Sequence, residues 1–246
     1  MKYPVFFILT ALLLSSCAIP EDVIRIDSTE NNVDWLMGKQ VVTKSNDSVT
    51  IALKYEQNRG KYLIFDTEIL NNSNNKLTVS PTDYIITGTS DTSTQNTTLV
   101  AMDPEIMLLE KDIEISRNMA AQKNAATTSL IVNTAMLATN VAMTTSNRDT
   151  PEKAMARAAA TDVANITTAA TYHSNVAQEH INLRERSFWA MDALRKTTLY
   201  PGESIRGNVL FPKNLMIQYF NVEINLSGIV FIFHFKQTRI PATNTY

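Results

Sequence analysis

Two kinds of hydrophobic pattern divide the chain. Residues 34–102 and 198–239 carry apolar side chains at every second position over short runs, which predicts strands with one buried face. Between them, residues 103–197 carry apolar side chains at intervals of three and four residues, which predicts helices. The pattern therefore predicts an α+β protein in which a helical segment interrupts a set of antiparallel strands.

The clearest strands lie in the first of these blocks. In Ser48–Gln57 and Lys61–Leu70 apolar and polar residues alternate, and Gly60 between them suits a tight turn. The polar composition of residues 88–98 predicts a loop, and Trp35 is expected to plug the core or an edge of the sheet. Both blocks together predict about seven or eight strands, a number typical of a β-sandwich.

Residues 103–197 predict two long helices joined by a short turn. Asp103-Pro104 forms one helix start, with an N-cap side chain and a proline at the first helical position, and Thr150-Pro151 forms the second. Arg195-Lys196 is a suitable end, because cations are favoured at the C-terminal pole of a helix dipole. Helices joined by so short a turn normally lie antiparallel, so this segment predicts a long helical hairpin inserted into the sandwich.

Charge is distributed unevenly along this hairpin. Charged residues are frequent near the strands, whereas Asn124–Asn147 has none and Asp162 is the lone charge between Ala158 and Gln178. A helix without charged side chains on any face is normally covered by another surface. The apolar residues of this half that we predict to form an interface are Leu130, Met136, Leu137, Val141, Met143, Met155, Val163 and Ile166.

Three interpretations of the uncharged half are open. The two helices bury it against each other and against the sandwich, or a second copy or another protein covers it, or it contacts a membrane. Asn124–Asn147 is long enough to span a bilayer, but its Asn, Ser and Thr content makes insertion unfavourable. The series Ile106, Leu109 and Ile113 continues the helical spacing of apolar residues toward the strands.

The N-terminus has the pattern of an export signal. Lys2 supplies a positive charge, and Val5–Leu14 is an apolar run too short to span a bilayer comfortably. The run ends in Leu14-Ser15-Ser16-Cys17, which resembles the lipobox of bacterial lipoproteins. The resemblance implies that residues 1–16 are a signal peptide, that Cys17 is lipidated, and that residues 17–33 form a lipidated tether to the membrane. A secretory signal followed by a buried cysteine, or an N-terminal membrane anchor, is the alternative.

The residue after the cysteine bears on localisation. In lipoproteins of the enterobacterial type an aspartate at this position retains the protein at the inner membrane, and here Ala18 takes its place. The resemblance therefore implies an outer-membrane lipoprotein that faces the periplasm or the cell surface. An inner-membrane anchor with the chain in the periplasm is the alternative.

Composition and motifs argue against several classes of function. With 22 Lys and Arg against 24 Asp and Glu, the chain has no basic patch that would bind nucleic acid. Cys17 is the single cysteine, so neither a disulfide nor a multi-cysteine metal site is possible within the chain. Ser204 lacks the strand–turn–helix context of a nucleophile elbow, and the spacing of His173 and His180 is too wide for one metal ion. We therefore expect no enzyme, metal or cofactor.

The last strand block carries a second resemblance. Pro201–Ser204, the small residue Gly207 in the next strand, and a closing hairpin before the tail at 240–246 resemble the end of immunoglobulin-like sandwich domains. The expected function is that of a non-enzymatic interaction or structural module of the cell envelope. The alternative is a carrier of small hydrophobic ligands, with a cleft between hairpin and sandwich lined by Met107, Met119, Phe188 or Trp189.

Overall fold

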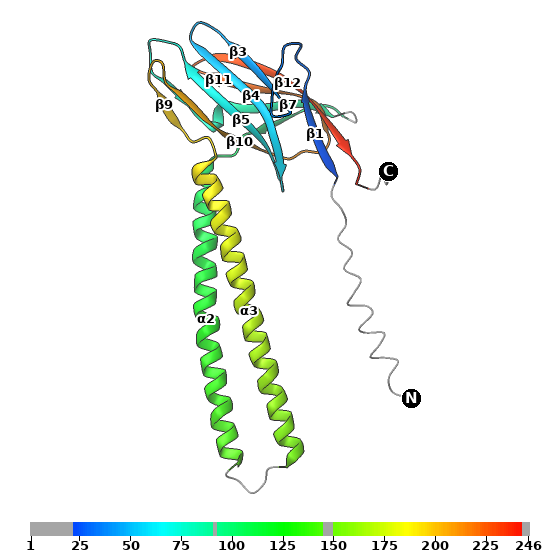
Figure 1. Cartoon of the computed structure of the whole chain (residues 1–246), viewed down its shortest axis with the longest axis vertical. Coiled ribbons are helices and arrows are strands. Elements are labelled where there is room, and N and C mark those ends of the chain that lie inside the picture. The colour runs from blue at the N-terminus through cyan, green and yellow to red at the C-terminus, as the bar shows by residue number, and fades with distance from the viewer. Residues whose placement is uncertain (1–21, 91–92, 145–149, 243–246) are drawn as a thin grey trace.

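Two long helices extend from one side of a block of antiparallel strands (Figure 1). The structure is a computed structural model of the whole chain, and it describes residues 22–90, 93–144 and 150–242. The side chains of residues 90, 93–96, 132, 133, 136–144, 153, 154 and 157 lie outside this description. The strands form two five-stranded sheets and one small two-stranded sheet.

The first sheet contains the first and last strands of the described chain and the hairpin of the last strand block. Its strands, in spatial order, are β1 (Val23–Ser28), β12 (Ile229–Ile240), β11 (Ile217–Leu226), β7 (Tyr84–Ser90) and β8 (Ser93–Val100). All its neighbouring strands are antiparallel. The β11–β12 hairpin turns at Ser227-Gly228, where both residues have positive φ angles of 52° and 85°. This hairpin was predicted from the Ser-Gly turn between two apolar strands.

The second sheet joins the two strand blocks across the helical segment. Its strands, in spatial order, are β10 (Ser204–Pro212), β5 (Tyr62–Asn71), β4 (Val49–Arg59), β3 (Lys39–Ser45) and β2 (Asp34–Leu36). Strand β10, from after the helices, pairs with β5 over its whole length. The small sheet pairs β6 (Leu77–Val79) with β9 (Thr197–Leu199), and a 3₁₀ turn at Pro81–Asp83 follows β6. The strands before and after the helices are therefore joined in two places, by the β10–β5 pair and by the β6–β9 pair.

The two large sheets share one apolar core. Phe65 on β5 is fully buried and lies at the centre of that core. Its ring packs edge-to-face on Phe211 of its own sheet, at 5.9 Å between centroids, and on Phe235 of the opposite sheet at 5.2 Å. Phe220 stacks on Phe235 at 5.7 Å. The alternating pattern of the sequence gives each sheet one apolar face. These two faces turn inward, and their aromatic and β-branched residues meet in the core.

The prediction of an α+β protein with antiparallel strands and two helices is confirmed, but the described residues form twelve strands rather than seven or eight. Part of the stretch assigned to the tether, Val23–Ser28, forms β1, because Ile24 and Ile26 are buried while the backbone pairs with β12. Most of the loop predicted at residues 88–98 belongs to β7 and β8. Strand β8 lies at the edge of its sheet, where backbone pairing with one neighbour can form a strand without an alternating apolar pattern.

The helices begin where the sequence predicts. Helix α2 spans Pro104–Thr144 and α3 spans Pro151–Met191, 41 residues each and therefore about 62 Å long. A carboxylate oxygen of Asp103 accepts a hydrogen bond from the backbone N–H of Glu105 at 2.9 Å, as an N-cap residue does. The helices run side by side in opposite directions and reach far beyond the strands (Figure 1). We call them the helical pair.

The helical pair is fastened to β10 and β5. The backbone N–H of Leu194 donates to Asn208 at 2.8 Å, and the N–H of Asn208 donates to Asp192 at 2.8 Å. Gly207 permits this approach, because a Cβ there would lie 2.8 Å from the Cα of Leu194. A small second core covers the junction and consists of Ile64, Met107, Trp189, Ala193 and Leu210.

Candidate contact surface on the helical pair

Polar contacts near the strands set the register of the two helices. Arg195 pairs with Glu105 at 2.6 Å, and Lys111 pairs with Glu185 at 2.6 Å. Farther from the strands, the side-chain amide of Gln122 donates to Glu179 at 3.0 Å. In this antiparallel register, residues late in α2 lie beside residues early in α3. The charged residues that the sequence places near the strands therefore pair between the helices.

The seam between the helices is mostly polar or small. Partly buried positions recur on each helix at intervals of three and four residues, the spacing of an interhelical contact. On α2 these are Leu108, Lys111, Glu114, Ile115, Asn118, Gln122, Ala125 and Ser129. On α3, before Phe188, they are Thr161, Ala164, Thr168, Asn175, Val176, Glu179, Glu185 and Arg186, with the buried Asn182 among them. Among the described side chains between Leu108 and Phe188, Asn182 alone is buried, at 2% exposure. The described part of the helical pair thus has no apolar core of its own.

Large apolar side chains face outward instead. Four residues of the predicted interface are strongly exposed, Leu130 at 70%, Met155 at 74%, Val163 at 64% and Ile166 at 68%. Their neighbour Ile131 is exposed at 64%. The remaining four predicted residues, Met136, Leu137, Val141 and Met143, have side chains outside the described part of the structure. We call Leu130, Ile131, Met155, Val163 and Ile166 the outer apolar surface.

Threonines add methyl groups to this part of the helical pair. The hydroxyl of Thr134 donates to the backbone carbonyl of Leu130 at 2.7 Å, and the hydroxyl of Thr167 donates to Val163 at 2.8 Å. Thr127 and Thr171 make the same bond to the residue four positions earlier. Because each hydroxyl is satisfied within its own helix, these side chains need no water or partner for hydrogen bonding. The sequence showed many threonines here but not that they bond in this way.

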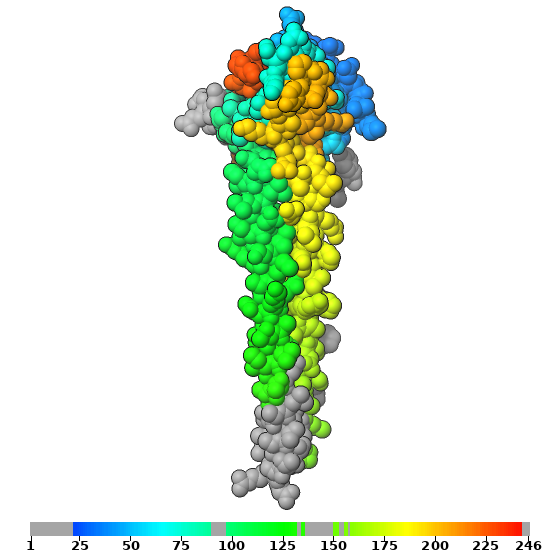
Figure 2. All heavy atoms as spheres, turned by 90° about the vertical axis from the view of Figure 1, so that its left-hand side faces the viewer, coloured from blue at the N-terminus to red at the C-terminus, as the bar shows by residue number. Residues whose placement is uncertain are grey.

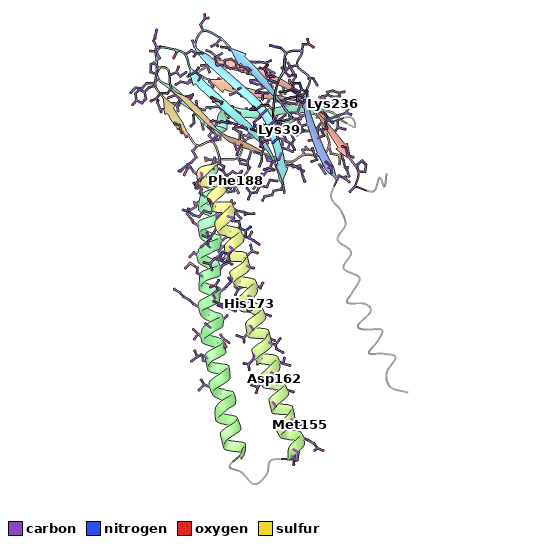
Figure 3. All side chains as sticks on the ribbon, in the orientation of Figure 1. Lys39, Met155, Asp162, His173, Phe188 and Lys236 are labelled. Atoms are coloured by element: carbon purple, nitrogen blue, oxygen red, sulfur yellow. The ribbon has the colours of Figure 1, made fainter. Side chains whose placement is uncertain are left out.

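The strands do not cover the outer apolar surface. Figure 2 shows the helical pair standing clear of the sheets over most of its length. In Figure 3, Phe188 lies where α3 meets the sheets, while Asp162 and Met155 lie progressively farther away. One interpretation was that the helices bury these residues against each other and against the sandwich. It is wrong for Leu130, Met155, Val163 and Ile166, because each of them is 64–74% exposed.

A cleft of about 380 Å³ lies at the junction of the helical pair and the sheets. Its apolar lining includes Met107 and Trp189, which are almost fully buried, and Phe188, on whose ring Arg59 rests at 4.3 Å. Met119 does not line it. The other lining residues are Gly60, Lys61, Tyr62, Glu110, Lys111, Glu114, Glu185 and Leu210, so half of the lining is charged. This is the space that a ligand carrier would use.

Ion pairs occupy part of that cleft. The ammonium of Lys111 lies 2.8 Å from Glu114 and 2.6 Å from Glu185. Burial alone would lower the pKa of Lys111, but the hydrogen bonds to these two carboxylates outweigh it and raise the pKa above its ordinary value. Tyr62 packs edge-to-face on Trp189 at 5.6 Å. The cleft is therefore a charged, partly closed junction rather than an apolar cavity.

The residues examined for catalysis do not come together. Ser204 is exposed at the start of β10, His173 packs beside Tyr172 on α3, and Nδ1 of His234 lies 2.7 Å from Asn221 on the outer face of a sheet. Within the described ranges, no group of three or more His, Cys, Asp or Glu residues is arranged to hold a metal ion. The described part of the chain thus offers no assembled set of acid, base and nucleophile.

The candidate anchor, Cys17, lies outside the described residues. Neither helix of the described chain combines the length and the apolar content that crossing a membrane requires. The comparisons with known proteins identify no relative: no protein family matches the sequence, no curated protein matches it, and no solved structure matches it. The residues and their geometry therefore carry the functional argument alone.

Proposed function

We propose that this protein is a lipid-anchored, non-enzymatic interaction module of the cell envelope, and that the uncharged half of the helical pair is its contact surface. One observation carries the proposal. The seam of the helical pair holds mostly small and polar side chains while Leu130, Val163 and Ile166 point outward. Two helices whose large apolar residues face outward bury little apolar surface against each other. A partner that covers those residues buries that surface instead.

The architecture in the proposal is an immunoglobulin-like sandwich interrupted by a helical hairpin. The shared core of the two sheets and the pairing of β10 with β5 across the helices support it. Such an arrangement presents a long, narrow projection on a rigid base. A projection of about 62 Å reaches well beyond the base, which suits contact with a second copy or with another envelope protein.

The anchor in the proposal is the lipidated Cys17, in the outer membrane or, as the alternative, in the inner membrane facing the periplasm. The lipobox pattern Leu14-Ser15-Ser16-Cys17 supports it. Fatty-acid analogues fed to growing cells should label the wild-type chain and not the Cys17→Ser variant. A variant that is still labelled would overturn the lipid anchor.

The carrier function stays a prediction and receives less support. An apolar ligand would have to displace the contacts of Lys111 with Glu114 and Glu185 or of Arg59 with Phe188. Burying charged groups beside an apolar ligand is costly unless they remain paired. A soluble chain starting at Ala18 that takes up a fluorescent fatty acid with saturable stoichiometry would favour the carrier over the interaction module.

The contact surface is tested by adding charge to it. The double variant Leu130→Glu and Ile166→Glu places two carboxylates on the outer apolar surface, and Met191→Glu is the matched control at an exposed methionine near the strands. Light scattering and pull-down from envelope extracts should show that wild type and control share an assembly or a bound partner that the double variant loses. Identical mass and identical pull-downs for all three proteins would remove the basis of the proposal.

A further inference from the structure

The turn between β2 and β3 exposes three consecutive large apolar residues. Trp35 is exposed at 64%, Leu36 at 47% and Met37 at 95%. The prediction that Trp35 plugs the core is wrong, because this residue is exposed, but its place at an edge is as predicted, because β2 is a three-residue strand at the outer edge of its sheet. We call Trp35, Leu36 and Met37 the apolar tip. A single exposed apolar residue is ordinary, but three in a row at a turn need a reason.

Backbone preference does not explain the methionine. Met37 has a φ angle of 50°, and Gly38 beside it has a φ angle of 79°. Glycine and asparagine adopt this left-handed conformation far more readily than a long side chain does. The turn therefore holds Met37 in a strained backbone conformation, and the flexible apolar side chain of Met37 occupies the most exposed position of the turn.

The apolar tip lies close to the point where the chain arrives from Cys17. Trp35 and Gly38 line one side of a groove of about 520 Å³, and Val23, at the start of β1, and Ile240, at the end of β12, line the same groove. Val23 and Ile240 are themselves exposed. In Figure 2 the blue atoms of the N-terminal part of the chain lie at one side of the strand block, off the axis of the helical pair. Apolar residues thus gather around the exit of the N-terminal chain.

The distance between this region and a lipidated cysteine is limited by chain length. Only five peptide units separate Cys17 from Asp22, the first described residue, and they span at most about 17 Å. A lipid chain on Cys17 inserted in a bilayer would therefore hold the start of β1 within that distance of the headgroups. Trp35 of the apolar tip lines the same groove as Val23 at the start of β1, on the part of the protein that the anchor would hold near the membrane.

We propose that the apolar tip inserts into the interfacial region of the bilayer that holds the Cys17 lipid, and that it thereby fixes the orientation of the protein on the membrane. The inference rests on the proposed lipid anchor. Tryptophan prefers the boundary between headgroups and acyl chains, where its apolar ring and its N–H group are both satisfied. Met37 and Leu36 add apolar area beside it, in the way that a second signal reinforces a lipid anchor.

The charged residues around the apolar tip predict how its contact with a bilayer depends on lipid charge and on salt. The nearby cations Arg25, Lys39 and Arg239 are each paired with a carboxylate, of Asp27, Glu56 and Asp22 respectively. A paired cation contributes little attraction to anionic lipid. We therefore expect contact of the tip with the bilayer to persist in vesicles of phosphatidylcholine alone and at high salt, unlike the binding of a basic patch.

The test uses tryptophan fluorescence of the full lipidated chain reconstituted in phosphatidylcholine vesicles with brominated acyl chains, which quench tryptophans on contact. The chain has two tryptophans, Trp35 and the almost fully buried Trp189. Wild type should float with the vesicles and lose part of its emission. The Trp35→Phe variant should float equally and lose none, because Trp189 lies in the junction core. Met37→Asn, which suits the left-handed turn, should reduce the quenching, whereas Met191→Asn should leave it unchanged.

The outcomes separate the tip from the anchor. Wild type that floats without quenching, with Trp35 still accessible to aqueous acrylamide, overturns the tip and leaves the anchor standing. Wild type that does not float overturns the anchor and the tip together. Protection from acrylamide that depends on protein concentration and occurs without quenching shows that a second copy covers the tip, which also overturns the membrane contact.

Discussion

The two sheets and the helical pair use apolar residues in opposite ways. In the sheets, Phe65, Ile51 and Leu53 are fully buried, and the residues that alternate with the buried ones on β4 are only partly buried. In the helical pair, Leu130 and Ile166 are mostly exposed while the partly buried seam holds residues such as Asn118 and Thr168. The same residue types thus stabilise the sheets from within and leave the helical pair with an apolar exterior.

Because the sheets bury their apolar residues and the helical pair exposes them, the two regions should contribute differently to stability. Burial of apolar surface is the main stabilising term of a fold, so the free energy of unfolding should reside in the sheets. The helical pair is held by its junction with β10, by intrahelical bonds and by ion pairs between the helices, and its exposed apolar side chains contribute little to the stability of the isolated chain. Substitutions in the two regions should therefore separate into those that change unfolding and those that change assembly.

Truncation of a ring in the shared core should have the largest effect. Phe65→Ala removes a ring that packs on three other phenylalanines and Tyr55, and should lower the free energy of unfolding by about 3–5 kcal/mol. Leu130→Ala, the matched change on the helical pair, should stay within about 0.5 kcal/mol, because the side chain is exposed and alanine favours helix. Urea unfolding measures both. A Leu130→Ala cost close to that of Phe65→Ala would show that the protein itself covers the outer apolar surface.

The junction between the two regions should be sensitive to one methyl group. Gly207→Ala places a Cβ against the backbone of Leu194, 2.8 Å from its Cα and 2.9 Å from its nitrogen. The clash should cost about 1–3 kcal/mol and speed hydrogen exchange at the amides of Leu194 and Asn208. Ser204→Ala, an exposed position on the same strand, is the control. Unchanged exchange in Gly207→Ala would mean that the helical pair is not fastened at this contact.

An ion cluster on the second sheet should link its stability to pH. Asp66 accepts hydrogen bonds from Arg206 at 2.6 Å and pairs with Lys54 at 3.1 Å. Burial raises the pKa of Asp66, but these bonds outweigh it and hold the pKa below its ordinary value of 3.8. Because the folded pKa is lowered, the stabilisation is present above pH 3.8 and is lost as the pH falls below that value.

Asp66→Asn is the variant that tests this link. At neutral pH it should lower the free energy of unfolding by about 1–3 kcal/mol, and the difference from wild type should shrink in acid. Asp47→Asn, at an exposed turn, should follow the wild-type pH curve. Parallel pH curves for Asp66→Asn and wild type would assign the acid sensitivity to other carboxylates.

The sequence predicts the elements well where local chemistry decides them. The alternation in β4 and β5 and the proline starts of α2 and α3 all appear in the structure. Strand β8 escaped prediction because backbone pairing at an edge needs no apolar pattern, and β1 because only Ile24 and Ile26 mark it.

The outward direction of the helical stripe was harder to predict. Helical spacing groups Ile106, Leu109 and Ile113 on one face, and such a face normally lies inside. In the structure all three are exposed, while Asn118 and Gln122 lie at the seam. Periodicity defines a face without defining what that face contacts, so our prediction of interface residues rests on their lack of charge and not on packing. The pairing of Gln122 with Glu179 fixes which face turns inward, and no local signal encodes it.

The smallest expected effect comes from the ion pair that links the two helices near the strands. Lys111 on α2 and Glu185 on α3 lie 2.6 Å apart, and Glu185 is partly exposed. A double-mutant cycle of Lys111→Ala and Glu185→Ala should give a coupling energy of about 0.2–1 kcal/mol, which falls with added salt. The value is small because Lys111 keeps Glu114, 2.8 Å away on its own helix, when Glu185 is removed.

This cycle measures what holds the helices together where they are charged. A coupling energy near zero for Lys111 with Glu185, beside a measurable one for Lys111 with Glu114, would contradict the antiparallel register derived from these contacts. A coupling energy of several kcal/mol would place substantial stability in the helical pair itself. The expected small value leaves the sheets as the stabilising region and the outer apolar surface free to contribute its burial energy to binding.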